Sequence, residues 1–226
     1  MEYLKFETHC HTGDVSACGR VPAAEMVALY KAAGYSGLCI TDHINPFTFG
    51  PELDTWEKKS RYFLQGYRNA KAAAGDDFDV LLGGEFHFHE NNNDYLVYGM
   101  TEELVEKELD NDILDWGIKR FSDFCRANGL LLIQAHPFRN SMQINSPGTV
   151  DGIEVLNCHP RHDSRNFIAE LWANRFGLLK TSGSDAHQPD DVGTGGIYVP
   201  QRLRTLDDLV REIRSGAKLI RPAGAV

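Results

Sequence analysis

Short apolar segments alternate with longer helical segments along the whole chain, and this alternation limits the possible folds more than any other feature. Runs of four to eight apolar and β-branched residues between turn residues are typical of buried strands. The segments between them carry helix signals, such as Pro22 in the first turn and Gly34 after the end of a helix predicted at 22–33. The predicted strands are 3–8, 37–41, 79–82, 95–98, 130–134, 152–156, 178–181 and 197–199.

The other predicted helices are 55–74, 113–127, 163–176 and a last helix that starts with a capping box at Thr205 and ends at Gly216. Strands joined by helices form mostly parallel sheets that are buried on both faces. About seven such units favour a closed or nearly closed barrel over an open doubly wound sheet. No glycine-rich nucleotide-binding motif follows the early strands, which removes the usual sign of the open alternative. Periodicity alone separates the two only weakly.

The composition is that of a folded globular protein. Of the 226 residues, 42% are apolar and 24% charged, which excludes disorder and coiled coils. There is no apolar run of about 18 residues, and acids stand where a signal peptide needs a basic start, so we expect a cytoplasmic protein. The net charge of −9 gives no bias toward long nucleic acid. Five scattered cysteines without a CxxC pair argue against a disulfide framework or a zinc finger.

Polar side chains follow the apolar segments at the points where the predicted strands end. Six strands lead to His9 and His11, to Asp42 and His43, to Glu85, to His136, to Asn157 and His159, and to Asp185 and His187. The carboxyl ends of parallel strands meet on one face of a barrel, so we expect these side chains to converge there. One such histidine is more often a packing residue, but six coincidences indicate a functional site.

These residue types predict a metal centre. Imidazoles and carboxylates suit Zn²⁺, Mn²⁺ or Fe²⁺. His9 and His11 alternate along a strand, so both rings point to one side. A tetrahedral zinc ion needs three or four protein ligands, whereas the first-rank candidates here are His9, His11, His43, Glu85, His136, Asp185 and His187. The surplus predicts two or three divalent ions, with Glu85 as the bridging carboxylate.

The same residues resemble the motifs of the PHP (polymerase and histidinol phosphatase) family of metal-dependent phosphoesterases. Residues 8–12 (THCHT) match its HxH element, and residues 40–43 (ITDH) match its TDH element. Residues 84–85, 135–137 and 183–187 (GSDAH) match its glycine–glutamate, HP and GSDxH elements, in the family's order. The resemblance covers nearly the whole chain. It implies one domain over residues 1–226, a distorted (β/α)7 barrel similar to a TIM barrel, and hydrolysis of phosphate esters.

Position by position, the resemblance implies three ion sites. His9 and His11 would share one ion with Glu85 and Asp185. A second ion would take Glu85, His136 and a residue of the hairpin after Glu85. A third would take His43, His187 and the residue before Gly19.

Two ligand positions depart from the family pattern. Cys18 precedes Gly19, where relatives often carry Asp or His; we assign Cys18, with Asp14 as the alternative. Asp94 stands where relatives often have His at the start of the returning strand. We favour Asp94 over His87 and His89, which alternate with Glu85 along one strand face.

The predicted activity is hydrolysis of a small phosphomonoester, such as a sugar phosphate, a nucleotide or histidinol phosphate, by hydroxide bound to the ions. No further catalytic side chain is predicted. Arg161 is the selected phosphate-binding residue and Arg139 the alternative. Nucleic acid is expected at most as a short or single-stranded end, and the oligomeric state stays open. The alternatives are an amidohydrolase-like enzyme acting on C–N or C–O bonds and a metal-binding module without catalysis.

Overall fold

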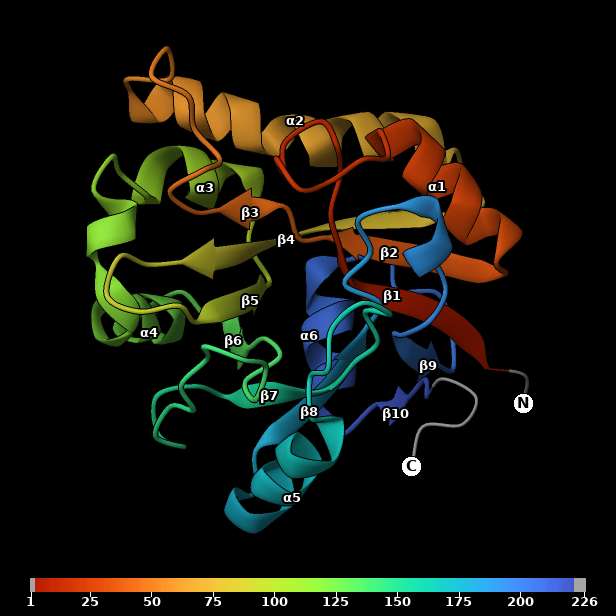
Figure 1. Cartoon of the computed structure of the whole chain (residues 1–226). Coiled ribbons are helices and arrows are strands. Elements are labelled where there is room, and N and C mark those ends of the chain that lie inside the picture. The colour runs from red at the N-terminus through yellow and green to blue at the C-terminus, as the bar shows by residue number, and fades with distance from the viewer. Residues whose placement is uncertain (1–2, 222–226) are drawn as a thin grey trace.

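A computed structural model describes residues 3–221 and forms a mixed sheet that curls into a nearly closed barrel (Figure 1). Within these residues the strands are β1 (Leu4–Cys10), β2 (Tyr35–Ile40), β3 (His43–Ile44), β4 (Asp79–His87), β5 (Asp94–Tyr98), β6 (Leu131–Gln134), β7 (Gly152–Asn157), β8 (Leu179–Gly183), β9 (Ile197–Val199) and β10 (Lys218–Leu219). Their order in the sheet is β10-β9-β1-β2-β4-β5-β6-β7-β8, with β3 paired to β4. All eight predicted strands are present, with ends shifted by a few residues.

The barrel closes where β1 meets the segment after β8. Cys10 forms an isolated parallel bridge with Ala186, and the amide of His11 donates to the carbonyl oxygen of Ala186 at 2.9 Å. The hydroxyl of Thr8 donates to the carbonyl oxygen of Ser182 at 2.6 Å. These contacts hold the end of β1 against the end of β8, so residues far apart in the chain share one rim.

Helices cover the outside of the sheet and close one of its ends (Figure 1). They are α1 (Ala23–Ala32), α2 (Trp56–Ala74), α3 (Glu102–Glu108), α4 (Gly117–Ala127), α5 (Asn166–Phe176) and α6 (Leu206–Arg214), with short 3-10 turns η1 (Ile113–Asp115) and η2 (Pro189–Asp191). The predicted capping box is present, because Thr205 accepts from the amide of Asp208 and the carboxylate of Asp208 accepts from that of Thr205. No helix among residues 3–221 is long and apolar enough to cross a membrane.

The apolar core has two parts, and this division positions the site. The larger part lies between the sheet and the outer helices and includes Tyr30, Phe63 and Phe121, which are fully buried. The smaller part fills one end of the barrel, where Leu209 and Ile213 of α6 pack against apolar side chains of the strands. The other end, at the carboxyl ends of the parallel strands, is left to polar side chains.

The strict alternation of a (β/α)7 barrel is not present, because β5 pairs antiparallel with both β4 and β6. Only residues 88–93 separate β4 from β5, and a parallel connection needs about a dozen residues or more. The helix predicted at 113–127 is also interrupted: Gly117 has a φ of +66°, and α4 begins there. Glu90 accepts the amide of Ile118 at 2.8 Å, which stabilises this helix start.

Candidate metal centre

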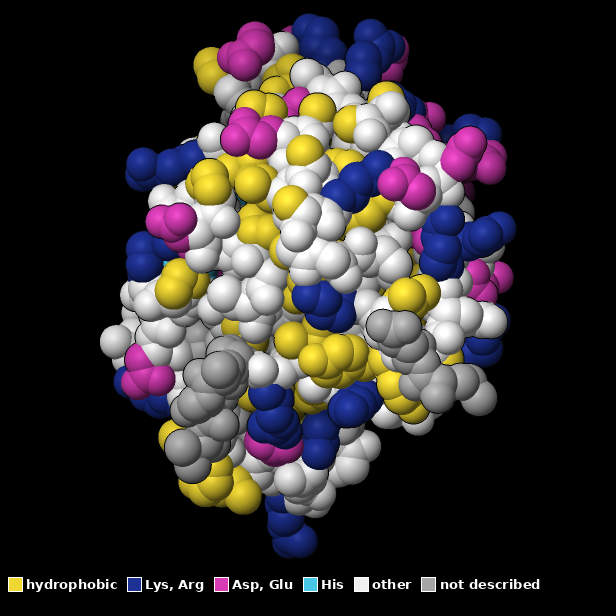
Figure 2. Space-filling view, turned by 90° about the vertical axis from the view of Figure 1, so that its right-hand side faces the viewer, with side chains coloured by type: hydrophobic (Ala, Val, Ile, Leu, Met, Phe, Trp, Pro, Cys, Tyr) yellow, Lys and Arg dark blue, Asp and Glu magenta, His cyan; other side chains and the backbone are white. Residues whose placement is uncertain are grey.

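The seven first-rank residues meet at one end of the barrel. His9 and His11 lie at the end of β1, His43 begins β3, and Glu85 lies on β4. His136 follows β6, and Asp185 and His187 follow β8. Five of the seven are at most 2% exposed. On the face that Figure 2 shows, acidic and basic side chains are interspersed and little histidine surface is visible.

Four of these residues bring one ligand atom each close to the others at the end of β1. Nε2 of His9 lies 3.1 Å from Nε2 of His11, and the two nitrogens lie 3.4 and 3.2 Å from Oε2 of Glu85. Oδ1 of Asp185 lies 3.4 Å from both nitrogens. Ligands about 2.0 Å from a zinc ion stand roughly 3.3 Å apart at tetrahedral angles. Nε2 of His9, Nε2 of His11 and Oδ1 of Asp185 therefore have the spacing of ligands around one small divalent cation, with Oε2 of Glu85 beside the two nitrogens. We call these four residues group 1.

Glu85 also faces a second set of ligand atoms with its other oxygen. Its Oε1 lies 3.2 Å from Nε2 of His136, and Oδ2 of Asp94 lies 3.8 Å from the same nitrogen. One ligand atom from each of Glu85, Asp94 and His136 falls within 4.8 Å of the others. We call this set group 2. Because its two oxygens face different groups, Glu85 has the geometry of a bridging carboxylate.

A third set contains three histidines. His11, His43 and His187 each offer a nitrogen within 4.8 Å of the others. Nδ1 of His43 is buried, lies 3.2 Å from Oε2 of Glu85 and has no hydrogen-bond partner among residues 3–221. A buried imidazole nitrogen without a partner is costly unless a ligand satisfies it. This set, group 3, therefore also fits a cation.

Protonation states differ across the centre. Burial, followed by the nearby His11, lowers the pKa of His43 to about 3, and burial lowers that of His187 to about 4. Both imidazoles are neutral near pH 7, as metal binding requires. Burial opposes the charged form of His11, but hydrogen bonds with Asp185 and Glu85 raise its pKa to about 9. A proton therefore competes with a cation at His11.

The backbone is strained at two residues of the centre. His136 has a φ of +28° and Asp185 a φ of +50°, in the region that only glycine adopts readily. Such conformations cost about 1–3 kcal/mol each and persist where the surrounding structure holds them. Strained backbone of this kind is common at functional sites, and at this rim it occurs at two of the predicted ligands.

Comparison with known proteins supports the resemblance to the PHP family. The PHP-associated family model (PHP_C) matches residues 163–217. A protein of Caldicellulosiruptor saccharolyticus named "Probable phosphatase" is 29% identical over 84% of this chain and 83% of its own length. The resemblance to the PHP family is confirmed. The chain accordingly belongs among the phosphoric ester hydrolases.

Two solved structures show the same fold. PsfC from Pseudomonas syringae superposes with a TM-score of 0.73 at 19% identity, over 99% of this chain and 93% of its own. A two-domain protein of Bacteroides vulgatus containing a predicted PHP-like metal-dependent phosphoesterase gives a TM-score of 0.63 at 18% identity. The match covers 98% of this chain and 65% of that protein.

The two departures from the PHP motifs differ in their surroundings. Asp94 lies in group 2, as described. The competing histidines lie outside the three groups: Nδ1 of His87 contacts Oδ1 of Asp94 at 2.9 Å, and the exposed His89 contacts Asp115 at 2.8 Å. His87 thus holds the second oxygen of Asp94 instead of occupying the ligand position.

Cys18 is exposed and lines the cavity beside His43 and His187, but it is in none of the three groups. Partial burial of its sulfur, followed by the negative charge of Glu85, raises the pKa of its thiol to about 12. The rival Asp14 is used elsewhere, since its oxygens accept the amide of Ala23 at the start of α1 and the side-chain amide of Asn69. The structure therefore disfavours Asp14, and Cys18 stays a prediction.

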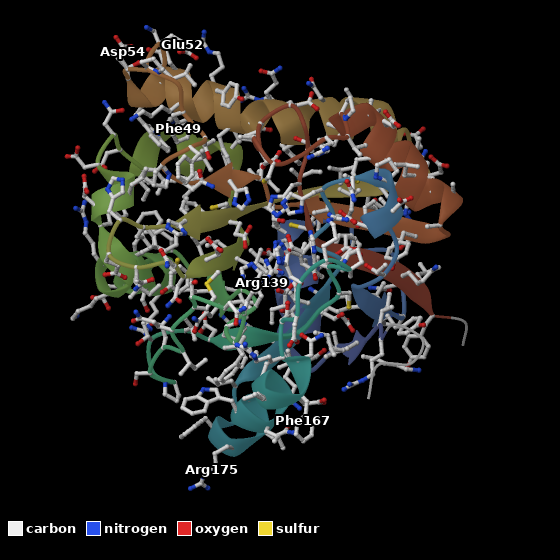
Figure 3. The ribbon with its side chains drawn as sticks, in the orientation of Figure 1. Phe49, Glu52, Asp54, Arg139, Phe167 and Arg175 are labelled. Atoms are coloured by element: carbon white, nitrogen blue, oxygen red, sulfur yellow. The ribbon has the colours of Figure 1, made fainter. Side chains whose placement is uncertain are left out.

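A cavity of about 340 Å³ opens over the PHP-like centre. Arg20, Arg139 and Arg161 line it together with ligand residues. The guanidinium of Arg161 donates to both oxygens of Asp191 at 2.5 and 2.7 Å. Arg139, near the middle of the molecule in Figure 3, donates to Asp185 and to Asn157 at 2.8 Å. The predicted Arg161 is thus at the cavity, but already paired with an acid.

The sequence analysis did not identify the side chains that contact the candidate ligands on the side away from the ion groups. Glu154 on β7 accepts from Nδ1 of His9 at 2.9 Å, and the hydroxyl of Ser16 lies 3.4 Å from Nδ1 of His11. Ser16 in turn donates to Asp42 at 2.8 Å, so Asp42 is connected to His11 through this hydroxyl. The signal for Glu154 was available: a carboxylate within an otherwise apolar strand must find a buried partner.

Proposed function

We propose that this chain is a metal-dependent phosphatase that hydrolyses small phosphomonoesters with two or three divalent ions. The observation that carries the proposal is the 3.1–3.4 Å spacing of the ligand atoms of group 1 together with the second oxygen of Glu85 in group 2. Two ion sites that share a carboxylate are typical of phosphoester hydrolysis. The fold and the relatives support the same reaction.

His9, His11, Glu85 and Asp185 would hold the first ion, and Glu85, Asp94 and His136 the second. His43 and His187 would hold a third, with Cys18 as the nearest further donor on the cavity wall. When bound, divalent ions of zinc, manganese or iron lower the pKa of coordinated water and neutralise the charge of the phosphoryl oxygens.

The arginines of the cavity would bind and orient the phosphate group. Arg139 is 16% exposed, and its buried Nε has no hydrogen-bond partner among residues 3–221, so a donor remains for an anionic ligand. Arg161 is 42% exposed and could turn its planar guanidinium toward the cavity. Guanidinium groups bind phosphate oxygens in a bidentate manner. We therefore assign phosphate binding to Arg161, as predicted, together with Arg139.

The cavity also limits the substrate. A volume of about 340 Å³ is near the lower end of the range for small-molecule sites. A phosphate group bound between the ions and the arginines would fill part of this space. The remaining volume suits a compact leaving group such as a sugar, a nucleoside or an amino alcohol.

The test is a substrate panel assayed with metal-stripped protein reloaded with Zn²⁺, Mn²⁺ or Fe²⁺. The panel contains sugar phosphates, nucleoside monophosphates, histidinol phosphate, a single-stranded oligonucleotide, lactones and amides. We expect phosphate release from monoesters that chelator abolishes and metal restores. Phosphate release that chelator does not affect would contradict the proposal. Turnover confined to lactones or amides would favour the amidohydrolase alternative, and metal binding without turnover the non-catalytic one.

A further inference from the structure

Glu154 contacts two of the candidate ion groups from behind without belonging to either of them. It lies on β7, its side chain is fully buried, and its two oxygens point in different directions. Oε1 accepts from Nδ1 of His9 in group 1 at 2.9 Å. Oε2 accepts from the backbone amide of His136 in group 2 at 3.1 Å.

The contact with His9 determines which ring nitrogen faces the centre. A carboxylate beside Nδ1 fixes the proton on that nitrogen, so Nε2 carries the lone pair. This is the nitrogen that lies 3.1 Å from Nε2 of His11. Without Glu154, His9 could rotate or change tautomer, and group 1 would lose a correctly oriented ligand.

The contact with His136 holds a strained backbone. His136 has a φ of +28°, which a β-substituted residue rarely adopts. The hydrogen bond to Oε2 of Glu154 fixes the amide of this residue, and Nε2 of the same residue lies 3.2 Å from Oε1 of Glu85. Relaxation of the backbone would move that ring away from group 2.

Asn157 adds a third connection. Its side-chain amide donates to Oε2 of Glu154 at 2.9 Å and to Oδ2 of Asp185 at 3.1 Å. Oδ2 of Asp185 also accepts from Arg139, which leaves Oδ1 facing group 1. The side chain of Glu154 therefore contacts both a ligand of group 1 and the backbone of a ligand of group 2.

We infer that Glu154 is a positioning residue that couples the two ion sites, so that a single carboxylate determines the affinity of both. The inference rests on the proposed metal sites of the enzyme. The carboxylate of Glu154 accepts hydrogen bonds from three donors: Nδ1 of His9, the backbone amide of His136 and the side-chain amide of Asn157. The side chain of glutamine has one acceptor oxygen and one NH₂ group, so its NH₂ group would face at least one of these donors. Glutamine therefore cannot keep the hydrogen bonds with both His9 and His136.

The experiment measures binding of Zn²⁺, and separately of Mn²⁺, to metal-stripped wild-type protein and to Glu154→Gln by calorimetry, with elemental analysis for stoichiometry. Loss of partners behind metal ligands typically weakens metal affinity by about 10–100-fold. We expect a loss of this size at both of the tightest sites. Co²⁺ provides a spectroscopic check, because its visible absorption reports tetrahedral geometry and should weaken in Glu154→Gln.

Two further variants separate positioning from general damage. Glu154→Asp keeps the charge and both acceptor oxygens but is one methylene shorter, so it should retain more affinity than Glu154→Gln. Asp79→Asn removes a carboxylate that pairs with Arg202 at the first residue of β4, six residues before Glu85, and should leave metal affinity unchanged. If Glu154→Gln does not fold, the same titrations are made with Glu154→Asp, whose shorter side chain should weaken binding at both sites by a smaller factor.

Wild-type affinity at both sites in the folded variant would overturn the inference, and so would a loss at one site alone. Absence of metal binding in the wild-type protein would instead refute the proposed function. The two failures are therefore distinguishable within one set of titrations.

Discussion

Gly183 lies so close to His9 that a Cβ atom built on the glycine would be 2.3 Å from the Cβ of the histidine. The same atom would lie 2.9 Å from Oε1 of Glu154. Real Cβ atoms do not approach this closely, so only glycine allows β8 to pack against β1 at this level. The glycine of the GSDAH segment thus has a steric role: it lets the strand that leads to Asp185 reach the histidines of β1.

Replacement of this glycine by alanine should damage both the fold and the centre. We expect Gly183→Ala to lower the free energy of unfolding by about 1–3 kcal/mol, as overpacking typically does, and to reduce metal content. Denaturant unfolding and elemental analysis would measure the two effects. Gly148→Ala is the control, because nothing lies within 4 Å of the Cβ position there. Equal stability of both variants would refute the steric role.

Glu85→Gln should affect more than one ion site. Both oxygens of Glu85 face imidazole nitrogens, and an amide can offer only one oxygen to a cation. Mutation of a residue that hydrogen-bonds to a metal ligand typically lowers metal affinity or activity by about 10–100-fold. Removal of a bridging ligand itself should therefore lower kcat by more than about 100-fold. Metal analysis should show a loss at more than one site. Glu170→Gln, which removes a surface partner of Arg221, should behave like the wild-type protein.

The fold could be predicted from the sequence as far as local patterns decide it. All eight expected strands form because apolar β-branched runs between turns have few other stable states. The antiparallel direction of β5 was missed, although the six residues 88–93 are too few for a crossover helix. Strand β10, of only two residues, depends on pairing with β9, and no local pattern predicts such a contact.

The site was more predictable than its supporting contacts. His9, Glu85 and Asp185 follow strands, and strand ends converge whatever the remaining sequence. Glu154 contacts a ligand that is remote in the chain, and the contacts of Ser16 depend on the course of a loop. Local sequence patterns do not predict contacts of either kind. The position of Cys18 depends on the course of a loop, so the motif alone could not decide its role.

Metal binding should strengthen as pH rises from about 6.5 to 9. The pKa of His11 in the metal-free protein is raised to about 9, so a cation must displace its proton below that pH. If His11 releases one proton, affinity should fall about tenfold for each unit by which the pH is lowered within this window. His43 and His187, with pKa values lowered to about 3 and about 4, do not titrate there.

The free energy of unfolding of the metal-free protein should fall as pH rises over the same range. A histidine with a raised pKa in the folded state contributes stability that is fully present below its unfolded pKa of about 6.5. This contribution is lost as pH rises through the folded value of about 9. The gap in Tm between zinc-loaded and metal-free protein should therefore widen from pH 6.5 to 9. A constant gap would show that His11 does not exchange a proton for the metal.

Arg161→Gln should weaken substrate binding with little effect on the folded protein. We expect KM to rise by about tenfold for the best monoester, since a charged hydrogen bond contributes about 1.5–3 kcal/mol. Arg161→Lys should recover only part of this loss, because lysine cannot bind phosphate in a bidentate manner. Arg175→Gln, at the end of α5 and away from the cavity (Figure 3), is the control. An unchanged KM in Arg161→Gln would leave Arg139 as the phosphate-binding residue.

Asp94 should determine the metal preference of group 2. This group offers two carboxylates and one imidazole, and carboxylate-rich sites favour Mn²⁺ relative to imidazole-rich ones. Asp94→His should therefore raise the ratio of zinc to manganese retained after dialysis against an equimolar mixture.

His87, which contacts the other oxygen of Asp94, should also influence the ion of group 2, but less than Asp94 does. His87→Ala frees the second oxygen of Asp94 and should loosen the ion of group 2 by about 10-fold. The chain offers a matched control in His89→Ala, since His89 makes a contact with Asp115 of nearly the same length, 2.8 Å against 2.9 Å, on the surface. Because the His89–Asp115 pair is exposed and belongs to none of the candidate ion groups, only His87→Ala should change manganese content. Equal effects of the two variants would show that Asp94 does not hold an ion.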